Sequence, residues 1–348
     1  MRKYEAVLCG YYGFGNLGDE LLAESIVSLY GKNCVSKNEL AILSADPAAS
    51  TSSLGIRAVD RWNPLAVWRV LLQSRTLILG GGGLFQDSTS VKSCLYYWGV
   101  LRMAWAAGCT PWMFGQSVGP FRRMVSELMA RNAIGRCVVR VVRDERSMKM
   151  LANWGYVASL APDPVVALTT DTCYRADGGR ILVNIRPWGD DSLPRKILSC
   201  ASRVSETTGL PIDLVAMAPE DEILSKKLIL EMGLDHIDIQ RIKDLADIRR
   251  AWRNAGFAFG MRLHFCILSL IFGLPCLAVP YDPKVSEFCV SHSLPMWNMD
   301  SLPDMLSLQE KPSQSMLVAE REEIEEKFGR SFKEVRKLRD RTGERKKT

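Results

Sequence analysis

The chain lacks several features that would assign it to a common class of protein. Its ten cysteines form no Cys-x-x-Cys pair and no cluster with any of the three histidines. This scatter argues against a disulfide framework and a structural zinc site, and it is typical of a reducing cytosol. No Gly-Lys-Ser/Thr motif is present, which excludes a P-loop. Nucleic-acid-binding motifs and basic clusters interleaved with aromatic residues are also missing, so we expect no nucleic-acid partner.

Long hydrophobic runs are missing too. Residues Met1–Glu5 pass directly into a strand-like segment, so we expect no secretory signal. The longest uncharged stretch, Phe265–Tyr281, is interrupted by Gly273, Pro275 and Pro280 and is too short to span a bilayer. With 348 residues, 47% hydrophobic and 24% charged, the composition is that of a soluble globular protein with room for two domains. The sequence therefore predicts a cytoplasmic protein.

The net charge of +6 is unevenly distributed. From Arg330 to the end there are nine Lys or Arg residues and three acids. From Met316 onward, Glu, Lys and Arg recur at i,i+4 spacing, which predicts an exposed helix that frays into a disordered end. The basic tail is either a solvated helix end or a segment attracted to anionic lipid at the inner face of a membrane.

Strand-like runs alternate with helical patterns, which is typical of βαβ units and parallel sheets. Two such series, separated by the polar segment 169–179, predict an α/β protein with two Rossmann-like domains facing each other across a central cleft. We place the domains at 1–172 and 173–312, followed by a charged helix and basic tail at 313–348. The predicted strands are Glu5–Cys9, Leu40–Leu43, Thr76–Leu79, Pro111–Phe114, Val138–Val142, Ile181–Ile185, Ile212–Met217, Ile237–Gln240, Gly256–Phe259 and Cys276–Val279.

The first strand leads into a literal G-x-G-x-x-G match at residues 13–18, the dinucleotide fingerprint. Two observations argue against a dinucleotide. Asp19 and Glu20 would repel a pyrophosphate at the helix start, and the candidate ribose acid Asp46 lies 28 residues after the motif rather than about 20. A loop in which Asn16 and Asp19 bind sugar hydroxyls fits this sequence better.

Two further glycine-rich segments follow the third and fourth predicted strands. Gly80–Asp87 contains four consecutive glycines, and Gly115–Pro120 contains two more. Glycine has no Cβ, so a ligand can approach the backbone closely. Because the carboxyl ends of parallel strands meet at one edge of a sheet, we expect these loops to share a ligand-binding edge.

The segment Gly260–His264 lies between the predicted strand 255–259 and the apolar helix 265–272. At a strand-to-helix corner, Arg262 and His264 can share one face, and helix N–H groups attract anions there. A permanent cation beside a titratable imidazole suits an anionic substrate that needs proton transfer. The alternative is that Arg262 binds a carboxylate of the protein and His264 packs in the core.

Other charged residues follow the remaining strands. Arg143 follows the fifth strand, and Asp144 is expected to cap the next helix. Asp163 lies in a rigid Ala-Pro-Asp-Pro turn. After the last core strand, Asp282 is expected to cap a helix, which leaves Lys284 either to reach an anion or to be solvated. His236 and His292 are given no role.

Taken together and in order, eight motifs resemble the polysaccharide pyruvyltransferase family, most closely its bacterial CsaB type. They cover about four-fifths of the chain: G-Y-Y-G-F-G-N-L-G-D-E, G-G-G-G-L-F-Q-D, G-Q-S-V-G-P, V-R-D-E-R-S, A-P-D-P, R-P-W, G-M-R-L-H and Y-D-P-K-V.

The resemblance implies a GT-B-like fold, no metal and no cofactor. It also implies transfer of pyruvate from phosphoenolpyruvate to an N-acetylhexosamine, such as N-acetylmannosamine, of a lipid-linked cell-wall polysaccharide precursor. The product is a 4,6-ketal that anchors surface-layer proteins, and phosphate is released. The second domain is expected to bind phosphoenolpyruvate and the first to bind the acceptor. The expected phosphoenolpyruvate ligands are Arg143, Arg262, His264 and Lys284; the expected acceptor residues are Gly13, Asn16, Asp19, Gly82, Gln86, Asp87 and Gln116.

His264 beside Arg262 is the best candidate general acid. Asp19, Asp87 or Asp163 could accept protons from the sugar, and the sequence does not choose among them. One rival is a nucleotide-sugar glycosyltransferase in which Glu287 holds a ribose. A second rival is a sugar-binding module without catalysis, against which the joint presence of the Arg and His residues argues. The sequence does not indicate an oligomeric state.

Overall fold

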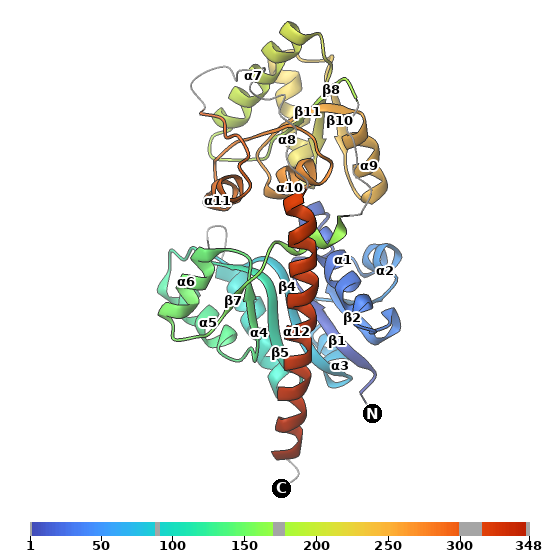
Figure 1. The fold of residues 1–348 in the computed structure, drawn as a ribbon, viewed down its shortest axis with the longest axis vertical. Coiled ribbons are helices and arrows are strands. Elements are labelled where there is room, and N and C mark those ends of the chain that lie inside the picture. Colours follow the sequence, from blue (N-terminus) through green and yellow to red (C-terminus); the bar gives the residue numbers. More distant parts are fainter. Residues whose placement is uncertain (1, 88–90, 170–177, 299–314, 346–348) are drawn as a thin grey trace. The chain divides into compact units, whose positions relative to one another are not determined.

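The computed structural model describes residues 2–87, 91–169, 178–298 and 315–345. The chain divides into two compact units (Figure 1). Unit 1 comprises Met1–Phe14, Asp19–Leu168 and Ala319–Thr348, and unit 2 comprises Gly15–Gly18 and Thr169–Val318. The domain boundaries predicted at residues 172 and 312 lie outside the described residues.

Unit 1 is built on a seven-stranded parallel sheet with the strand order β3-β2-β1-β4-β5-β6-β7. Alternation of parallel strands and helices makes it Rossmann-like, as predicted. The strands are β1 (Tyr4–Cys9), β2 (Leu40–Ser44), β3 (Arg57–Asp60), β4 (Ser74–Phe85), β5 (Thr110–Val118), β6 (Arg140–Val142) and β7 (Ser159–Leu160). The helices are α1 (Leu17–Lys32), α2 (Pro47–Leu54), α3 (Pro64–Leu72), α4 (Val91–Ala106), α5 (Met124–Ile134), α6 (Glu145–Asn153) and α12 (Ser315–Arg345), with short 3₁₀ turns at Lys37–Glu39 and Pro164–Leu168.

Unit 2 has a five-stranded parallel sheet with the order β10-β9-β8-β11-β12 and is also Rossmann-like. Its strands are β8 (Arg180–Asn184), β9 (Ile212–Ala216), β10 (Asp238–Arg241), β11 (Ala255–Gly260) and β12 (Cys276–Ala278). Its helices are α7 (Ser192–Thr208), α8 (Pro219–Met232), α9 (Leu245–Arg253), α10 (Leu263–Ile271) and α11 (Pro283–Ser291). The ten predicted strands all correspond to observed ones, whereas β3 and β7 were not predicted.

Helices cover both faces of the unit 1 sheet. Side chains of α3, α4, α5 and α6 form one core with the sheet, and side chains of α1, α2 and α12 form the other. Both faces of the sheet are therefore covered by helices. This explains why the strand sequences are continuous apolar runs rather than alternating apolar and polar residues.

The terminal helix α12 differs from the exposed helix predicted from its charge. Ile324, Phe328, Phe332 and Val335 recur at helical spacing and are buried in the unit 1 core. Phe328 and Phe332 pack edge-on against Tyr30, with ring centroids 5.0 and 5.2 Å away. The prediction was wrong because the helix has an apolar face beside its charged residues, and one of those, Arg339, itself pairs with the buried Glu5 of β1 at 2.9 Å.

The glycine-rich segments also differ from the loops that were predicted. β4 continues through all four glycines to Phe85, and β5 continues to Val118. The two strands stay paired along this length, with Gly80 opposite Phe114 and Gly82 opposite Gln116. The glycines therefore lie in the sheet at its carboxyl edge, not in a loop beyond it.

Predicted caps are confirmed at two helix starts. The Asp144 carboxylate accepts the N–H of Ser147 at 2.7 Å and begins α6. The Asp282 carboxylate accepts the N–H of Lys284 at 2.9 Å and begins α11. Both helices thus start immediately after a strand at the carboxyl edge.

Candidate functional site

The Arg262–His264 segment lies at the predicted corner, where β11 ends and α10 begins. Arg262 occupies the N-cap position and His264 the second position of the helix, and no side chain caps α10. The backbone N–H of Arg262 donates to the Asn184 side chain of β8 at 3.0 Å. Asn184 in turn donates to the carbonyl of Val215 in β9 at 2.8 Å. This chain of hydrogen bonds fixes the corner to the centre of the unit 2 sheet.

The Arg262 guanidinium is committed to carboxylates of the protein. Its Nε and Nη2 donate to both oxygens of Asp221 at 2.7 and 2.6 Å, and Nη2 also donates to Glu220 at 2.9 Å. The Arg262 side chain is 9% exposed and that of Asp221 0%. This geometry matches the alternative in which Arg262 binds a carboxylate, and it disagrees with the direct phosphoenolpyruvate-binding role predicted for Arg262.

The electrostatics of this trio follow from burial and pairing. Burial alone would lower the pKa of Arg262, but the hydrogen bonds and charges of Asp221 and Glu220 outweigh it and raise that pKa. Burial raises the pKa of Asp221 in spite of Arg262. The half-exposed Glu220 has a lowered pKa, because a backbone hydrogen bond and the Arg262 charge outweigh its burial. Arg262 therefore stays charged and is shared by two acids.

His264 lies against the start of α1. Residues 15–18 belong to unit 2 by their contacts: Leu17 N–H donates to the Met217 carbonyl at 2.8 Å, and Arg241 donates to the Gly15 carbonyl at 2.5 Å. A Cβ at Gly18 would lie well within 3.0 Å of the His264 ring atoms, a separation that real Cβ atoms do not adopt. Gly18 is thus the residue that allows the His264 ring to occupy its position.

We expect Gly18→Ala to lower the kcat of the reaction proposed below by on the order of 10²-fold. The added Cβ would displace the His264 ring by a substantial fraction of its width. Gly31→Ala is the matched control in the same helix, since a Cβ there meets nothing within 4 Å. Steady-state kinetics and circular dichroism of both variants test this. Equal activity of the two variants would show that the His264 position does not matter.

Two arginines missing from the predicted site lie at the same edge of the unit 2 sheet. Arg186 follows β8 and donates from Nη1 to the Tyr281 hydroxyl at 3.1 Å; Arg241 ends β10. In each, one buried guanidinium nitrogen, Nε of Arg186 and Nη1 of Arg241, has no hydrogen-bond partner in the described structure. Burial lowers the pKa of Arg241. Guanidinium nitrogens of this kind are able to donate hydrogen bonds to an anionic ligand. The only sequence signal was the Arg-Pro-Trp motif at residue 186.

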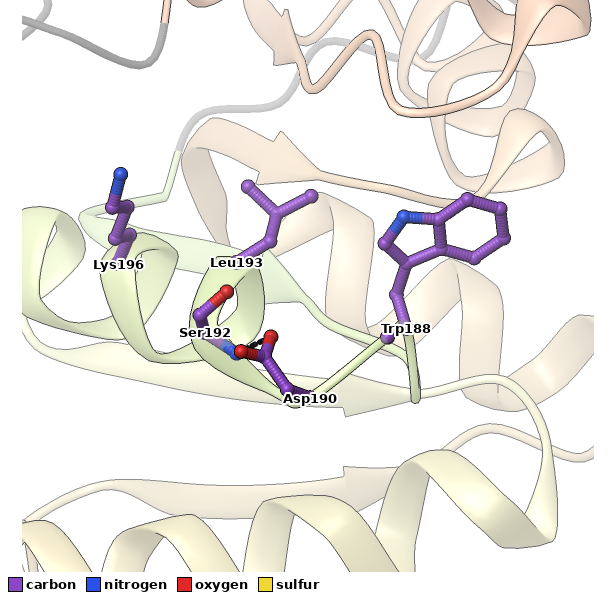
Figure 2. Close-up of a pocket in the computed structure, with 6 residues that line it drawn as sticks. Trp188, Asp190, Ser192, Leu193 and Lys196 are labelled. Atoms are coloured by element: carbon purple, nitrogen blue, oxygen red, sulfur yellow. Dashed lines mark hydrogen bonds between the residues drawn. The ribbon is translucent and has the colours of Figure 1, made fainter.

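A surface hollow of about 340 Å³ lies where α7 begins. Figure 2 shows Trp188, Leu193 and Lys196 pointing to the same side of this segment. The Asp190 carboxylate accepts the Ser192 N–H at 3.1 Å and shapes the turn. Trp188 contacts Tyr281 edge-on at 4.9 Å, so the hollow adjoins the Arg186–Tyr281 pair. Lys284, half-buried in the first turn of α11, lies three residues from Tyr281 in the chain.

In unit 1, two predicted site residues pair with each other. The Arg143 Nη1 lies 2.5 Å from the Asp163 carboxylate, and their side chains are 8% and 6% exposed. The Arg143 Nε also donates to the Ser117 hydroxyl at 2.9 Å. A buried ion pair of this kind fixes β5, β6 and the turn after β7, which argues against Arg143 as a free phosphoenolpyruvate ligand and against Asp163 as a base.

Three of the predicted acceptor residues meet where β4 and β5 end. The Gln116 side chain donates to the Gly81 carbonyl at 2.6 Å. A Cβ at Gly82 would lie 3.0 Å from the Asp19 carboxylate, so Asp19 packs on the glycine backbone. Asp19 therefore lies beside the glycine backbone at this edge.

The other predicted acceptor residues have structural contacts. Asp87 accepts the backbone N–H groups of Arg122 and Arg123 at 2.6 and 2.9 Å, and these bonds hold its pKa below the usual value although burial alone would raise it. Because both carboxylate oxygens of Asp87 accept backbone N–H groups, this geometry argues against Asp87 as the base. Asn16 accepts the Gly18 N–H at 3.3 Å, and Gly13 donates to Glu20 at 2.8 Å. Gln86 lies just beyond β4, half-buried.

An aromatic cluster beside this edge was not predicted. Tyr11 and Phe14 stack at 4.1 Å, Phe14 meets Trp62 edge-on at 6.3 Å, and Trp62 contacts Tyr96 at 5.6 Å. The buried Arg61 guanidinium lies beneath the rings, 4.2 Å from the Tyr96 centroid. Tyr11 and Trp62 remain 42% and 61% exposed. We refer to Tyr11, Phe14, Trp62 and Tyr96 as the aromatic platform. Its members come from three separate segments, so no sequence spacing reveals it.

None of the helices among the described residues is long and apolar enough to cross a membrane. Within the same residues, no group of three or more His, Cys, Asp and Glu side chains is arranged to hold a metal ion.

The two units together define a GT-B-like α/β protein. In fold, the chain is similar to the UDP-GlcNAc 2-epimerase of Methanocaldococcus jannaschii (TM-score 0.60, 12% identity, 97% of this chain and 99% of that chain). It is also similar to the UDP-N-acetylglucosamine 2-epimerase of Rickettsia bellii (TM-score 0.60, 12% identity, 97% of both chains). A third similar structure is Anabaena Alr3699/HepE in complex with UDP and glucose (TM-score 0.57, 10% identity, 98% of this chain and 99% of that chain). At sequence identities of 10–12%, these similarities support a shared fold and nothing further.

The sequence itself is more specific. The family model of polysaccharide pyruvyl transferase matches residues 16–283, which is most of the chain. The chain therefore belongs to the polysaccharide pyruvyl transferase family, as its motifs predict. No curated protein matches it significantly in sequence.

Proposed function

We propose that this protein transfers pyruvate from phosphoenolpyruvate to an N-acetylhexosamine of a lipid-linked polysaccharide precursor, as in the CsaB type, and that it works at the inner face of the cytoplasmic membrane. The observation that carries this proposal is the Arg262–His264 corner of unit 2. It combines an uncapped helix start, an imidazole held close to Gly18, and a cluster of arginines. Phosphoenolpyruvate bears a phosphate and a carboxylate, which suit such an arrangement.

In this proposal, His264 protonates the methylene carbon of phosphoenolpyruvate, which becomes the methyl group of the product. One sugar hydroxyl then attacks the electron-poor C2 and loses its proton. The bond between C2 and the phosphate oxygen then breaks, and phosphate leaves with the electron pair. The second hydroxyl attacks C2, gives its proton to the deprotonated His264 and closes the 4,6-ketal. Asp19 is the base that we propose for a hydroxyl proton, because its carboxylate lies at the glycine-lined edge of unit 1.

The anionic groups of phosphoenolpyruvate would be bound by Lys284, Arg186 and the first N–H groups of α10. Arg262 would act on this site through its carboxylate partners, as a positioning residue. Arg143 would instead hold the carboxyl edge of unit 1 through its pair with Asp163. This division revises the ligand set that the motifs suggest. The reason for the revision is that the guanidinium groups of Arg262 and Arg143 already pair with carboxylates of the protein.

The reaction test is direct. The protein is incubated with phosphoenolpyruvate and a water-soluble N-acetylhexosamine disaccharide, and the products are analysed by mass spectrometry and phosphate release. We expect a saccharide heavier by one pyruvate ketal. In a parallel incubation with UDP-sugars, glycosyl transfer would instead support the nucleotide-sugar alternative, in which Glu287 of α11 contacts the ribose.

The aromatic platform suits the apolar face of a pyranose, because Tyr and Trp combine a flat apolar ring with a polar edge. We expect Trp62→Ala to raise the KM for the saccharide roughly three- to tenfold, the size of one lost ring contact. The KM for phosphoenolpyruvate should not change. Trp105→Ala is the control, since Trp105 is exposed to a similar extent, 59%, but lies in the last turn of α4. If both variants behave alike, the platform does not bind the acceptor.

A further inference from the structure

Exposed apolar side chains gather on one part of unit 1. Leu65 of α3, Leu95 of α4, and Met124, Val125 and Leu128 of α5 are between 53% and 78% exposed. All five lie in the first two turns of their helices. Single exposed leucines are ordinary, but five large side chains at equivalent positions of three neighbouring helices form a surface that needs an explanation.

Topology brings these residues to one rim. α3, α4 and α5 pack on the same face of the sheet, and each begins where a parallel strand has just ended. Their first turns therefore lie along the carboxyl edge, on the outer side of that face. The same edge carries the Gly80–Gly83 segment and the aromatic platform. We call Leu65, Leu95, Met124, Val125 and Leu128, with Lys92, Arg122 and Arg123, the apolar–basic rim.

The rim itself holds three cations, Lys92 in the first turn of α4 and Arg122 and Arg123 just before α5. Two acids beside it face inward: Asp87 accepts the backbone N–H groups of Arg122 and Arg123, and Glu127 accepts the Trp154 indole N–H at 2.9 Å. The side chains of Arg122 and Arg123 remain exposed. At the end of β3, Asp60 is the nearest exposed acid in sequence, and it accepts the Trp62 N–H.

We infer that the apolar–basic rim docks on an anionic phospholipid bilayer. Large apolar side chains flanked by cations are the composition of interfacial membrane-binding surfaces. Exposed acids at the same edge are Asp60, at the end of β3, and Glu145, in the first turn of α6, which pairs with Lys149. An acidic protein would match the cations but not the protruding apolar residues. The inference rests on the proposed function in one respect: a lipid-linked acceptor would then reach the carboxyl edge of unit 1 from the bilayer on which the rim docks.

The experiment compares full-length variants by co-sedimentation with vesicles of phosphatidylglycerol and phosphatidylcholine in equal parts, at low salt. The rim variant carries Arg122→Gln, Arg123→Gln, Met124→Gln, Val125→Gln and Leu128→Gln. The matched control removes three equally exposed apolar residues and two cations from unit 2 helices: Ile223→Gln, Lys226→Gln, Lys227→Gln, Leu230→Gln and Val290→Gln. A third variant, Lys333→Gln with Lys337→Gln, tests the basic face of α12.

Each cation near an anionic leaflet strengthens binding about fivefold, and the apolar contacts add to this. We therefore expect the rim variant to lose on the order of 100-fold in vesicle partitioning, and the control and α12 variants to lose less than about threefold. Wild-type binding should also fall with added salt and on pure phosphatidylcholine. Thermal melting checks that each variant is folded. A folded rim variant that sediments like wild type overturns the inference.

Two further measurements separate the alternatives. If light scattering shows a wild-type dimer that the rim variant converts to a monomer, with vesicle binding unchanged, the rim is an interface between copies and the inference fails. Phosphate release with a water-soluble acceptor should be equal in wild type and the rim variant. If wild type releases no phosphate but its vesicle binding depends on the rim, the proposed function is wrong and the membrane-docking inference stands. If wild type releases phosphate but its vesicle binding does not depend on the rim, the membrane-docking inference is wrong and the proposed function stands.

Discussion

His264→Ala should abolish turnover with phosphoenolpyruvate while leaving both units folded. His264 lies at the carboxyl edge of the unit 2 sheet, in the first turn of an uncapped helix. Histidine is the side chain that most often transfers protons in catalysis near neutral pH. Removing a general acid costs on the order of 10²–10⁴ in rate. Phosphate release and ketal formation, measured at saturating acceptor, give the size of the loss.

The control is His236→Ala, because His236 is exposed and lies in the turn before β10. It should retain full activity. His264→Gln adds a second check, since glutamine keeps hydrogen-bonding capacity but cannot transfer a proton. Near-normal turnover of either His264 variant would show that His264 is not the general acid.

Much of the fold follows from local patterns in the sequence. All ten predicted strands are observed because buried parallel strands are continuous apolar runs, and Asp144 and Asp282 cap helices as their positions predict. The corner at residues 260–264 was located for the same reason. β3 and β7 were missed because their sequences, Arg-Ala-Val-Asp and Ser-Leu, contain no long run of apolar residues. Such segments carry too little periodicity to be distinguished from loops.

The partners of charged residues could not be predicted, because they depend on contacts between distant segments. Arg262 and Asp221 are 41 residues apart, and Arg143 and Asp163 are 20 apart. Sequence spacing shows a cation at each strand end, but not which acid lies beside it. The same limit hid the buried face of α12 and the aromatic platform. In each case the side-chain type was visible, whereas its surroundings came from the tertiary fold.

Arg262→Met is the variant in which the two interpretations of this arginine differ most. If Arg262 mainly neutralises Asp221, its loss leaves a fully buried carboxylate without a cation and lowers the free energy of unfolding of unit 2 by about 3–5 kcal/mol. Adding Asp221→Asn should recover part of that loss, because it removes the buried charge. Arg249→Met, at an exposed position of α9, should have no effect. Urea unfolding followed by fluorescence measures all four proteins.

A different outcome would restore the direct role that the motif suggests. In that case Arg262→Met would unfold like wild type, while kcat/KM for phosphoenolpyruvate would fall tenfold or more, the cost of one contact to an ionised group. Asp221→Asn would not compensate. The two results are separable because stability is measured without substrate, and the catalytic effect is read only from the fraction that remains folded. The three hydrogen bonds from Arg262 to Asp221 and Glu220 make the stability result the expected one.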